Sequence, residues 1–72
     1  MPVVEIAVPD GPKIRKLRIR KGYPTQEDLA AKIGRHRSWV SAMETGQRRQ
    51  SLALMCAVAE ALDVPVDEIL AA

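Results

Sequence analysis

The sequence contains no phenylalanine, and only one tryptophan, one tyrosine and one cysteine among its 72 residues. Because alanine, valine, leucine and isoleucine must then form the core, we expect helices that contact one another through small side chains. A single cysteine excludes a disulfide within the chain and a cysteine-rich metal site. Since no apolar run approaches the roughly 18 residues of a membrane span, and the N-terminus does not resemble a secretion signal, we expect no membrane segment and a cytoplasmic location.

Charge is divided unevenly along the chain. Residues 15–49 contain ten basic and three acidic side chains, a net charge of +7, whereas residues 50–72 contain four acidic side chains and no basic one. The overall composition, 47% hydrophobic and 28% charged, is typical of one soluble globular domain whose stability is marginal or shared with a second copy. A polyanion would dock on the basic part, although charge alone fits a solvated surface equally well.

The first residues differ in pattern from the rest. Residues 2–8 are rich in β-branched side chains and have the length of a short strand, and the segment PDGP at 9–12 predicts a turn. The pattern contains no second strand-like segment, and an isolated strand cannot satisfy its backbone groups. The strand therefore either pairs with the same strand of another copy, which we favour, or packs as a loose arm. We expect residues 1–12 to form this arm and residues 13–72 the domain.

From Lys13 onward, apolar residues recur at helical spacing, which predicts an all-α domain. Thr25 and Ser51 are suitable N-caps, and Gly34 and Gly46 are natural helix ends. The expected helices cover residues 13–22, 26–33, about 37–44, 52–62 and about 66–70.

Residues 26–45 meet the physical requirements of a helix-turn-helix. Ala30 is small enough for the second helix to cross over it, and Gly34 allows a positive φ at the turn. The apolar side chains that would fix the angle between the two helices are Leu29, Ile33, Val40 and Met43.

Four segments of the sequence resemble the lambda-repressor-like, or Xre/Cro-type, helix-turn-helix family. These are IRKLR at 14–18, TQEDLA at 25–30, WVSAMETG at 39–46 and AEALDVPVDEIL at 59–70. They keep the family's order and near-standard spacing, and the resemblance covers nearly all of residues 13–70. It implies a five-helix fold that binds double-stranded DNA as a homodimer and controls transcription.

The resemblance also implies roles for individual residues. Gln26 matches the position that contacts the DNA backbone from the start of the second helix, and Arg18 and Glu44 match a pair that forms a partly buried salt bridge. The third helix would be the recognition helix. Its matching outward positions are Arg37, Ser38, Ser41 and Ala42.

The sequence departs from the family pattern in three places. The connection at residues 22–25 is one residue longer than the commonest form. Arg35 replaces an apolar residue and could extend toward a phosphate. His36 replaces the serine or threonine that caps the recognition helix, so that helix begins either near Arg37 or later, with Ser38 as its cap.

The side chains themselves favour contact with DNA at the recognition helix and after it. We expect Arg37 to contact guanine O6 and N7 or a phosphate, and Ala42 to meet a thymine methyl group if it contacts a base. Trp39 is predicted to support the helix, with its indole N–H toward a phosphate, and Arg48 and Arg49 to hold the DNA backbone. The candidate DNA-binding residues are Gln26, Arg35, His36, Arg37, Ser38, Trp39, Ser41, Ala42, Gln47, Arg48 and Arg49.

The remaining reactive side chains do not form a catalytic or metal-binding pattern. His36 is the only histidine, and we expect Cys56, which lies among apolar residues of the fourth predicted helix, to be an inert packed thiol. A phosphate-binding glycine loop, a carboxylate pair and a nucleophile with its base are all missing from the sequence. We therefore expect neither an enzyme nor a cofactor.

The sequence thus predicts a sequence-specific DNA-binding transcriptional regulator, most readily a repressor, that binds a palindromic operator as a homodimer. The same fold would also serve an antitoxin or a restriction–modification controller, with a toxin or a polymerase subunit as protein partner. A third alternative is a protein-interaction module that has kept the fold and binds an acidic protein. Arg35 and Arg37, at the exposed start of the recognition helix, favour DNA.

Overall fold

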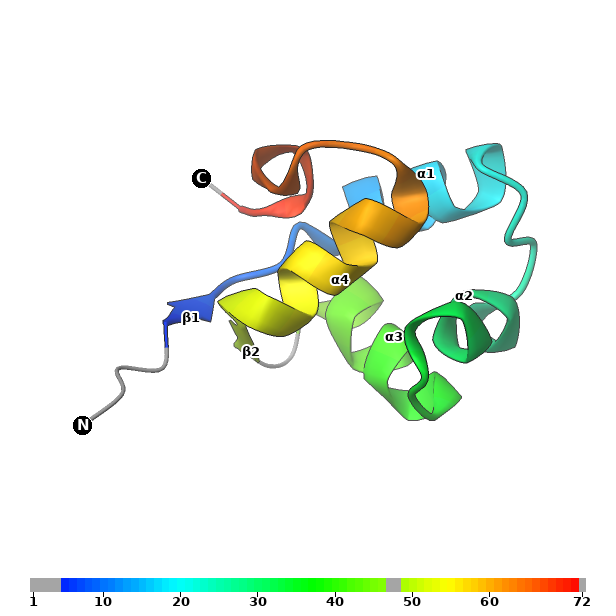
Figure 1. Cartoon of the computed structure of the whole chain (residues 1–72), viewed down its shortest axis with the longest axis horizontal. Helices are drawn as coiled ribbons and strands as arrows, with labels where there is room; N and C mark the ends of the chain where they lie inside the picture. The colour runs from blue at the N-terminus through cyan, green and yellow to red at the C-terminus, as the bar shows by residue number, and fades with distance from the viewer. Residues whose placement is uncertain (1–4, 47–48, 72) are drawn as a thin grey trace.

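The computed structural model describes residues 5–46 and 49–71, which fold into four α-helices, one 3-10 helix and a small sheet. Figure 1 shows α4 in the middle of the molecule, with α1, α2 and α3 around it. The elements in chain order are β1 (Ile6–Ala7), α1 (Gly11–Arg20), α2 (Gln26–Ile33), α3 (Arg37–Thr45), β2 (Gln50–Ser51), α4 (Leu52–Leu62) and η1 (Val66–Ile69).

The predicted all-α, lambda-repressor-like class is confirmed, but the count of five α-helices is wrong. The last segment, Val66–Ile69, is a 3-10 helix of four residues. It contains the i→i+3 bond that Glu68 N donates to Pro65 O at 3.0 Å. In a 3-10 helix, side chains three residues apart also lie on one face, so the apolar spacing of this segment did not distinguish it from an α-helix. Within the described ranges, none of the helices is long and apolar enough to cross a membrane.

α1 begins two residues before the predicted start at Lys13, inside the segment expected to be a turn. Asp10 is the N-cap, and its side chain accepts a hydrogen bond from Lys13 N at 3.3 Å. Pro12 fits the first turn because the N–H that it lacks would have had no partner there. Gly11 is buried at the same point, and a Cβ on it would lie 2.0 Å from Glu44 O at the end of α3. The absence of a side chain at Gly11 therefore lets the start of α1 approach the end of α3.

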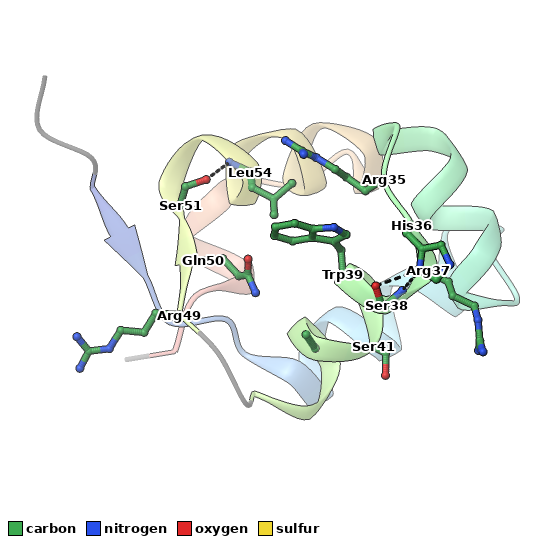
Figure 2. A pocket seen from close by; sticks show the side chains of 11 residues that line it. Arg35, His36, Arg37, Ser38, Trp39, Ser41, Arg49, Gln50, Ser51 and Leu54 are labelled. Carbon is green, nitrogen blue, oxygen red and sulfur yellow. Dashed lines mark hydrogen bonds between the residues drawn. The ribbon is translucent and has the colours of Figure 1, made fainter.

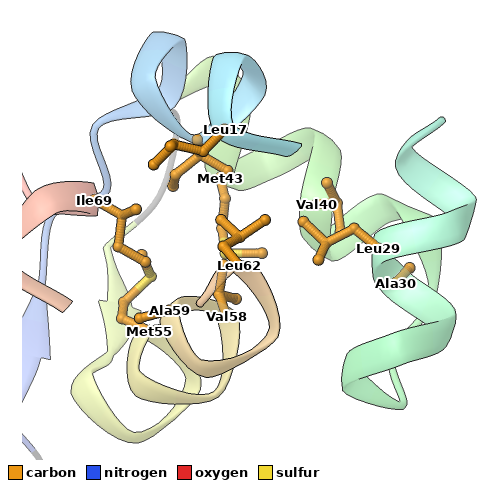
Figure 3. Close-up of a cluster of buried hydrophobic side chains, with 11 residues drawn as sticks. Leu17, Leu29, Ala30, Val40, Met43, Met55, Val58, Ala59, Leu62 and Ile69 are labelled. Atoms are coloured by element: carbon orange, nitrogen blue, oxygen red, sulfur yellow. The ribbon is translucent and has the colours of Figure 1, made fainter. Parts of the chain in front are cut away.

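Apolar side chains from all four α-helices and η1 form the core (Figure 3). Leu29 and Ala30 of α2 meet Val40 of α3 at one end of it. The largest fully buried side chains are Ile14, Leu29, Met43, Met55, Leu62, Ile69, Val40 and Val58. Of the four residues predicted to fix the helix-turn-helix angle, Leu29, Val40 and Met43 are fully buried, and Ile33 is partly buried against the same cluster.

Cys56 is exposed, so the prediction of a packed thiol is wrong. The buried positions of α4 include Met55, Val58, Ala59 and Leu62. Cys56 follows Met55 by one residue, and successive side chains of an α-helix point about 100° apart. The buried neighbours of Cys56 in the sequence therefore lie on a different face of the helix.

Of the strand predicted at residues 2–8, the structure shows only Ile6–Ala7, and residues 2–4 lie outside the described residues. The expectation that the chain holds no partner for this strand is wrong. β1 pairs antiparallel with β2 of the same chain, with Ile6 opposite Ser51 and Ala7 opposite Gln50. A further bridge joins Pro9 to Leu70. β2 is two polar residues long and shows no alternation of apolar and polar side chains, so no periodicity in the sequence could reveal it.

Candidate nucleic-acid interface

α2 and α3 form the helix-turn-helix, and local hydrogen bonds fix both the start of α2 and the turn. Thr25 and Asp28 make a capping box, in which Asp28 N donates to Thr25 Oγ1 at 3.2 Å and Thr25 N donates to Asp28 Oδ2 at 3.1 Å. Gly34 ends α2 with φ of 69°, and Arg35 N then donates to Ala30 O at 2.9 Å. The positive φ expected at Gly34 is confirmed, and it turns the chain sharply into α3.

α3 begins at Arg37, and His36 is its N-cap, which rules out the alternative in which Ser38 caps the helix. His36 Nδ1 accepts a hydrogen bond from Ser38 N at 3.2 Å and also lies 3.0 Å from Ser38 Oγ. Because Nδ1 must be an acceptor for this bond, the neutral ring carries its proton on Nε2. The imidazole nitrogen accepts the capping hydrogen bond in place of the usual serine or threonine hydroxyl, although histidine is not among the preferred N-cap residues.

One side of α3 is buried and the other is open to solvent. Val40 and Met43 are fully buried, whereas Arg37 and Ser38 are exposed and Ser41 and Ala42 are partly buried. The outward positions of the predicted recognition helix thus lie on its accessible side.

A groove of about 810 Å³ separates α3 from the start of α4 (Figure 2). It brings together eight of the eleven candidate DNA-binding residues with three that sequence reasoning did not select. The lining residues are Arg35, His36, Arg37, Ser38, Trp39, Ser41, Ala42, Arg49, Gln50, Ser51 and Leu54.

Trp39 lies in the groove and is 40% exposed, with the guanidinium carbon of Arg35 5.3 Å from its ring centre. Figure 2 shows the indole between α3 and Leu54 of α4, with Arg35 on the α4 side. A guanidinium at this distance from an indole ring is held by a cation–π interaction. Arg35 therefore has an intramolecular partner, and the polar residue at this usually apolar position is accommodated by stacking.

The expected salt bridge between Arg18 and Glu44 is confirmed. Arg18 Nε lies 2.6 Å from Glu44 Oε2, and each side chain is 6% exposed. Arg18 Nη1 also donates to Tyr23 O at 2.9 Å, and Gln26 Nε2 donates to Glu44 Oε1 at 3.3 Å. This network joins α1, α2 and α3. It also fixes the amide of Gln26 at the start of α2, outside the groove, through one of its two N–H groups.

Comparison with known proteins identifies the family. A model described as a helix-turn-helix domain matches residues 11–72. The chain belongs to this family. Its fold is that of a DNA-binding regulator.

Two curated relatives and one solved structure are similar to the chain over most of its length. Control protein C.BamHI of Bacillus amyloliquefaciens is 35% identical over 60 residues, which are 83% of this chain and 74% of that protein. Control protein C.MunI of a Mycoplasma species is 32% identical over 65 residues, 90% of this chain and 88% of that protein. The crystal structure of the restriction-modification controller protein C.AhdI from Aeromonas hydrophila has a TM-score of 0.73 and 43% identity, covering 81% of this chain and 86% of that one.

The part of this helix-turn-helix protein that follows α3 contains residues that the sequence did not single out. Gln50, which is 5% exposed, and Leu54, which is 6% exposed, line the groove from β2 and α4. The only sequence feature that pointed to this region was Ser51, the predicted N-cap of the fourth helix. The cap is confirmed, because the Ser51 side chain accepts a hydrogen bond from Leu54 N at 3.1 Å. Arg49 is exposed at the rim, with its side chain directed away from Trp39 (Figure 2). Gln47 and Arg48, also predicted to contact DNA, lie outside the described residues.

Proposed function

We propose that this protein is a restriction–modification controller that binds its operator DNA through α3 and the groove beside it. The observation that carries this proposal is the arrangement of side chains around the groove, where exposed basic and hydroxyl groups of α3 face solvent across the groove from Arg49. A DNA reader needs such an accessible helix with cations beside it, to neutralise phosphates. The similarity to three control proteins supports the choice of controller.

In this proposal, different residues supply specificity and affinity. Arg37, at the exposed first position of α3, would donate two hydrogen bonds to guanine O6 and N7, and Ser38 and Ser41 would contact bases or phosphates beside it. Ala42 would meet a thymine methyl group. The other candidate residues would bind the backbone instead, namely Gln26, Arg35, His36, Trp39, Gln47, Arg48 and Arg49.

The second N–H of the Gln26 amide supports its assignment to the DNA backbone. The first N–H donates to Glu44, which in turn is held by Arg18. The amide is therefore oriented before DNA arrives, and its remaining N–H could donate to a phosphate without a change of rotamer.

We further propose that the controller acts as a homodimer on a palindromic operator. Two copies of α3 would then enter successive major grooves about 34 Å apart. The acidic residues 50–72 contrast with the basic residues 15–49, so a face built from the C-terminal part could meet the second copy while the basic part meets DNA. Bound over a promoter, the dimer would repress by excluding the polymerase.

The experiment that tests the proposal starts with selection of bound duplexes from a random pool, followed by affinity measurements on the selected sequence at several salt concentrations. Binding should weaken steeply as salt increases. Arg37→Ala should lower affinity by about 5- to 150-fold, corresponding to about 1–3 kcal/mol for a bidentate base contact, and relax the preference for guanine at one position.

Arg15→Ala is the matched control, because Arg15 is an exposed residue of α1 and does not line the groove. It should change affinity by much less than Arg37→Ala. If the wild-type protein shows neither sequence preference nor salt dependence, the proposal is wrong, and a protein-interaction module is the better interpretation.

A further inference from the structure

Residues 5–10, the part of the predicted N-terminal arm that the structure describes ahead of α1, lie outside the helix-turn-helix. From here on, the arm means these six residues. The matching family model starts at residue 11, so the arm lies outside it. Yet its backbone is bonded to the rest of the fold at its start, middle and end. Leu52 N donates to Glu5 O, Ala71 N to Val8 O and Asp10 N to Ile69 O, each at 2.8 Å. A segment with so many backbone bonds has a defined place in the fold.

The arm reaches the groove through β2. Arg49, Gln50 and Ser51 all line the groove, and β2 consists of the last two of these. Ser51 is also the N-cap of α4, which begins at the next residue. The position of β2 therefore sets both the backbone of Arg49 and the first turn of α4, on the side of the groove opposite α3.

The register identifies which arm residue bonds to β2. In an antiparallel pair, directly opposite residues alternate between hydrogen-bonded and non-hydrogen-bonded pairs. Glu5 and Leu52 form a hydrogen-bonded pair, so Ala7 and Gln50, two residues along, form the next one. Ile6 lies between them opposite Ser51, and its backbone N–H points to the outer edge, away from β2.

The other end of the arm is anchored independently of β2. Pro9 is buried and bridges Leu70, and Asp10 caps α1. Figure 1 shows the arm running from the start of α1 to β1, which lies beside β2. The arm is thus held at both of its ends.

We infer that the arm is a positioning element for DNA binding, which holds β2 so that Arg49 is in place to contact a phosphate. This inference rests on the proposed function. Without the arm, the entropy cost of ordering β2 and Arg49 would exceed the gain from a single phosphate contact, so the contact would be lost and the affinity would fall. Ala7 is the positioning residue, since its backbone holds β2, and Arg49 is the residue that contacts DNA.

Two proline variants of the full chain test the inference as a matched pair. Ala7→Pro removes the N–H that bonds to Gln50, whereas Ile6→Pro removes an N–H that faces away from β2. With the duplex selected by the wild-type protein as probe, Ala7→Pro should weaken binding about tenfold and reduce the slope of log affinity against log salt by about 1, the signature of one lost phosphate contact. Ile6→Pro should bind like the wild type.

A double-mutant cycle separates positioning from a general loss of stability. In an Arg49→Ala background the arm has no phosphate contact to position, so Ala7→Pro should have little further effect. Deletion of residues 1–7 removes the same pairing without introducing proline, and it should reproduce the loss, which keeps the test valid if Ala7→Pro does not fold.

Three results would overturn the inference. These are unchanged affinity after the deletion or Ala7→Pro, an equal loss with and without Arg49, and a loss in Ile6→Pro that matches Ala7→Pro. The last would mean that the outer edge of β1 is needed, for example by a second copy, and sedimentation would reveal it as a change in mass. Absence of both sequence preference and salt dependence in the wild-type protein would refute the proposed function itself, so the two failures are distinguishable.

Discussion

The two sides of the groove are held in place by different forces. On the α3 side, the helix-turn-helix is fixed by buried side chains, because Leu29 and Val40 are fully buried and the Arg18–Glu44 pair is 6% exposed. On the β2 side, the arm is fixed mainly by backbone hydrogen bonds, and its side chains Ile6 and Val8 are 63% and 45% exposed. Substitution of side chains should therefore damage the helix-turn-helix, and removal of backbone donors the attachment of the arm.

The largest loss of stability is expected for the buried ion pair on the α3 side of the groove. Glu44→Ala would leave Arg18 buried without its counter-ion and Gln26 without its acceptor. Removing one partner of a buried pair costs about 3–5 kcal/mol, a large part of the total stability of a domain of this size. Urea unfolding measures the change. The exposed Glu27 of α2 provides the control, and Glu27→Ala should change the free energy of unfolding by less than about 0.5 kcal/mol. Equal losses in the two variants would mean that the network adds no stability.

A smaller loss is expected where the arm enters α1. The added methyl group of Gly11→Ala would meet the backbone carbonyl of Glu44, which cannot move aside as a flexible side chain would. Overpacking of this kind costs about 1–3 kcal/mol. The comparison is with Lys13→Ala on the exposed side of the same helix, which should unfold at nearly the wild-type urea concentration. A Gly11→Ala variant as stable as the wild type would contradict the close approach of α1 and α3.

Loss of the imidazole cap should have a still smaller effect. His36→Ala removes the acceptor of Ser38 N, and loss of an N-cap costs about 1 kcal/mol. His36→Asn, which supplies an oxygen at a similar place, should restore most of that stability in thermal unfolding followed by circular dichroism. If alanine and asparagine are equivalent at this position, the hydrogen bond to Ser38 N does not stabilise α3.

The smallest effect is expected for a side chain of the arm. Because Ile6 is largely exposed, Ile6→Ala should change the free energy of unfolding by less than about 0.5 kcal/mol. Leu29→Ala on the α3 side is the matching variant, and it should cost about 2–5 kcal/mol because it leaves a cavity. Similar losses in both would show that the two sides are not held differently.

The same contrast explains how much could be predicted from the sequence. The helix-turn-helix, its glycine turn, the caps Thr25 and Ser51 and the Arg18–Glu44 pair are encoded by side chains at fixed spacing, so pattern and family resemblance found them. The pairing of β1 with β2 depends on backbone groups, which every residue has, and two residues are too few for a periodic signal. Gln50 was not predicted to line the groove because it belongs to β2, which is too short to give such a signal.

Other differences came from geometry that a linear pattern does not carry. Apolar neighbours in the sequence suggested that Cys56 was packed, but its place on α4 turns it to solvent. The imidazole of His36 caps α3 with a nitrogen, in place of the hydroxyl oxygen that the family pattern favours. For both residues the helix itself was predicted correctly. What the sequence did not show was the direction in which the side chain of Cys56 or His36 points.

The place of Trp39 gives the protein an optical probe of its own groove. It is the only tryptophan in the chain, so emission excited in the indole band arises from this one ring. The ring lies against the guanidinium of Arg35 and is 40% exposed, which makes its emission sensitive to the polarity and charge beside it. DNA that enters the groove or displaces Arg35 would change both. Titrations followed by intrinsic fluorescence can therefore report on the binding surface without any added label.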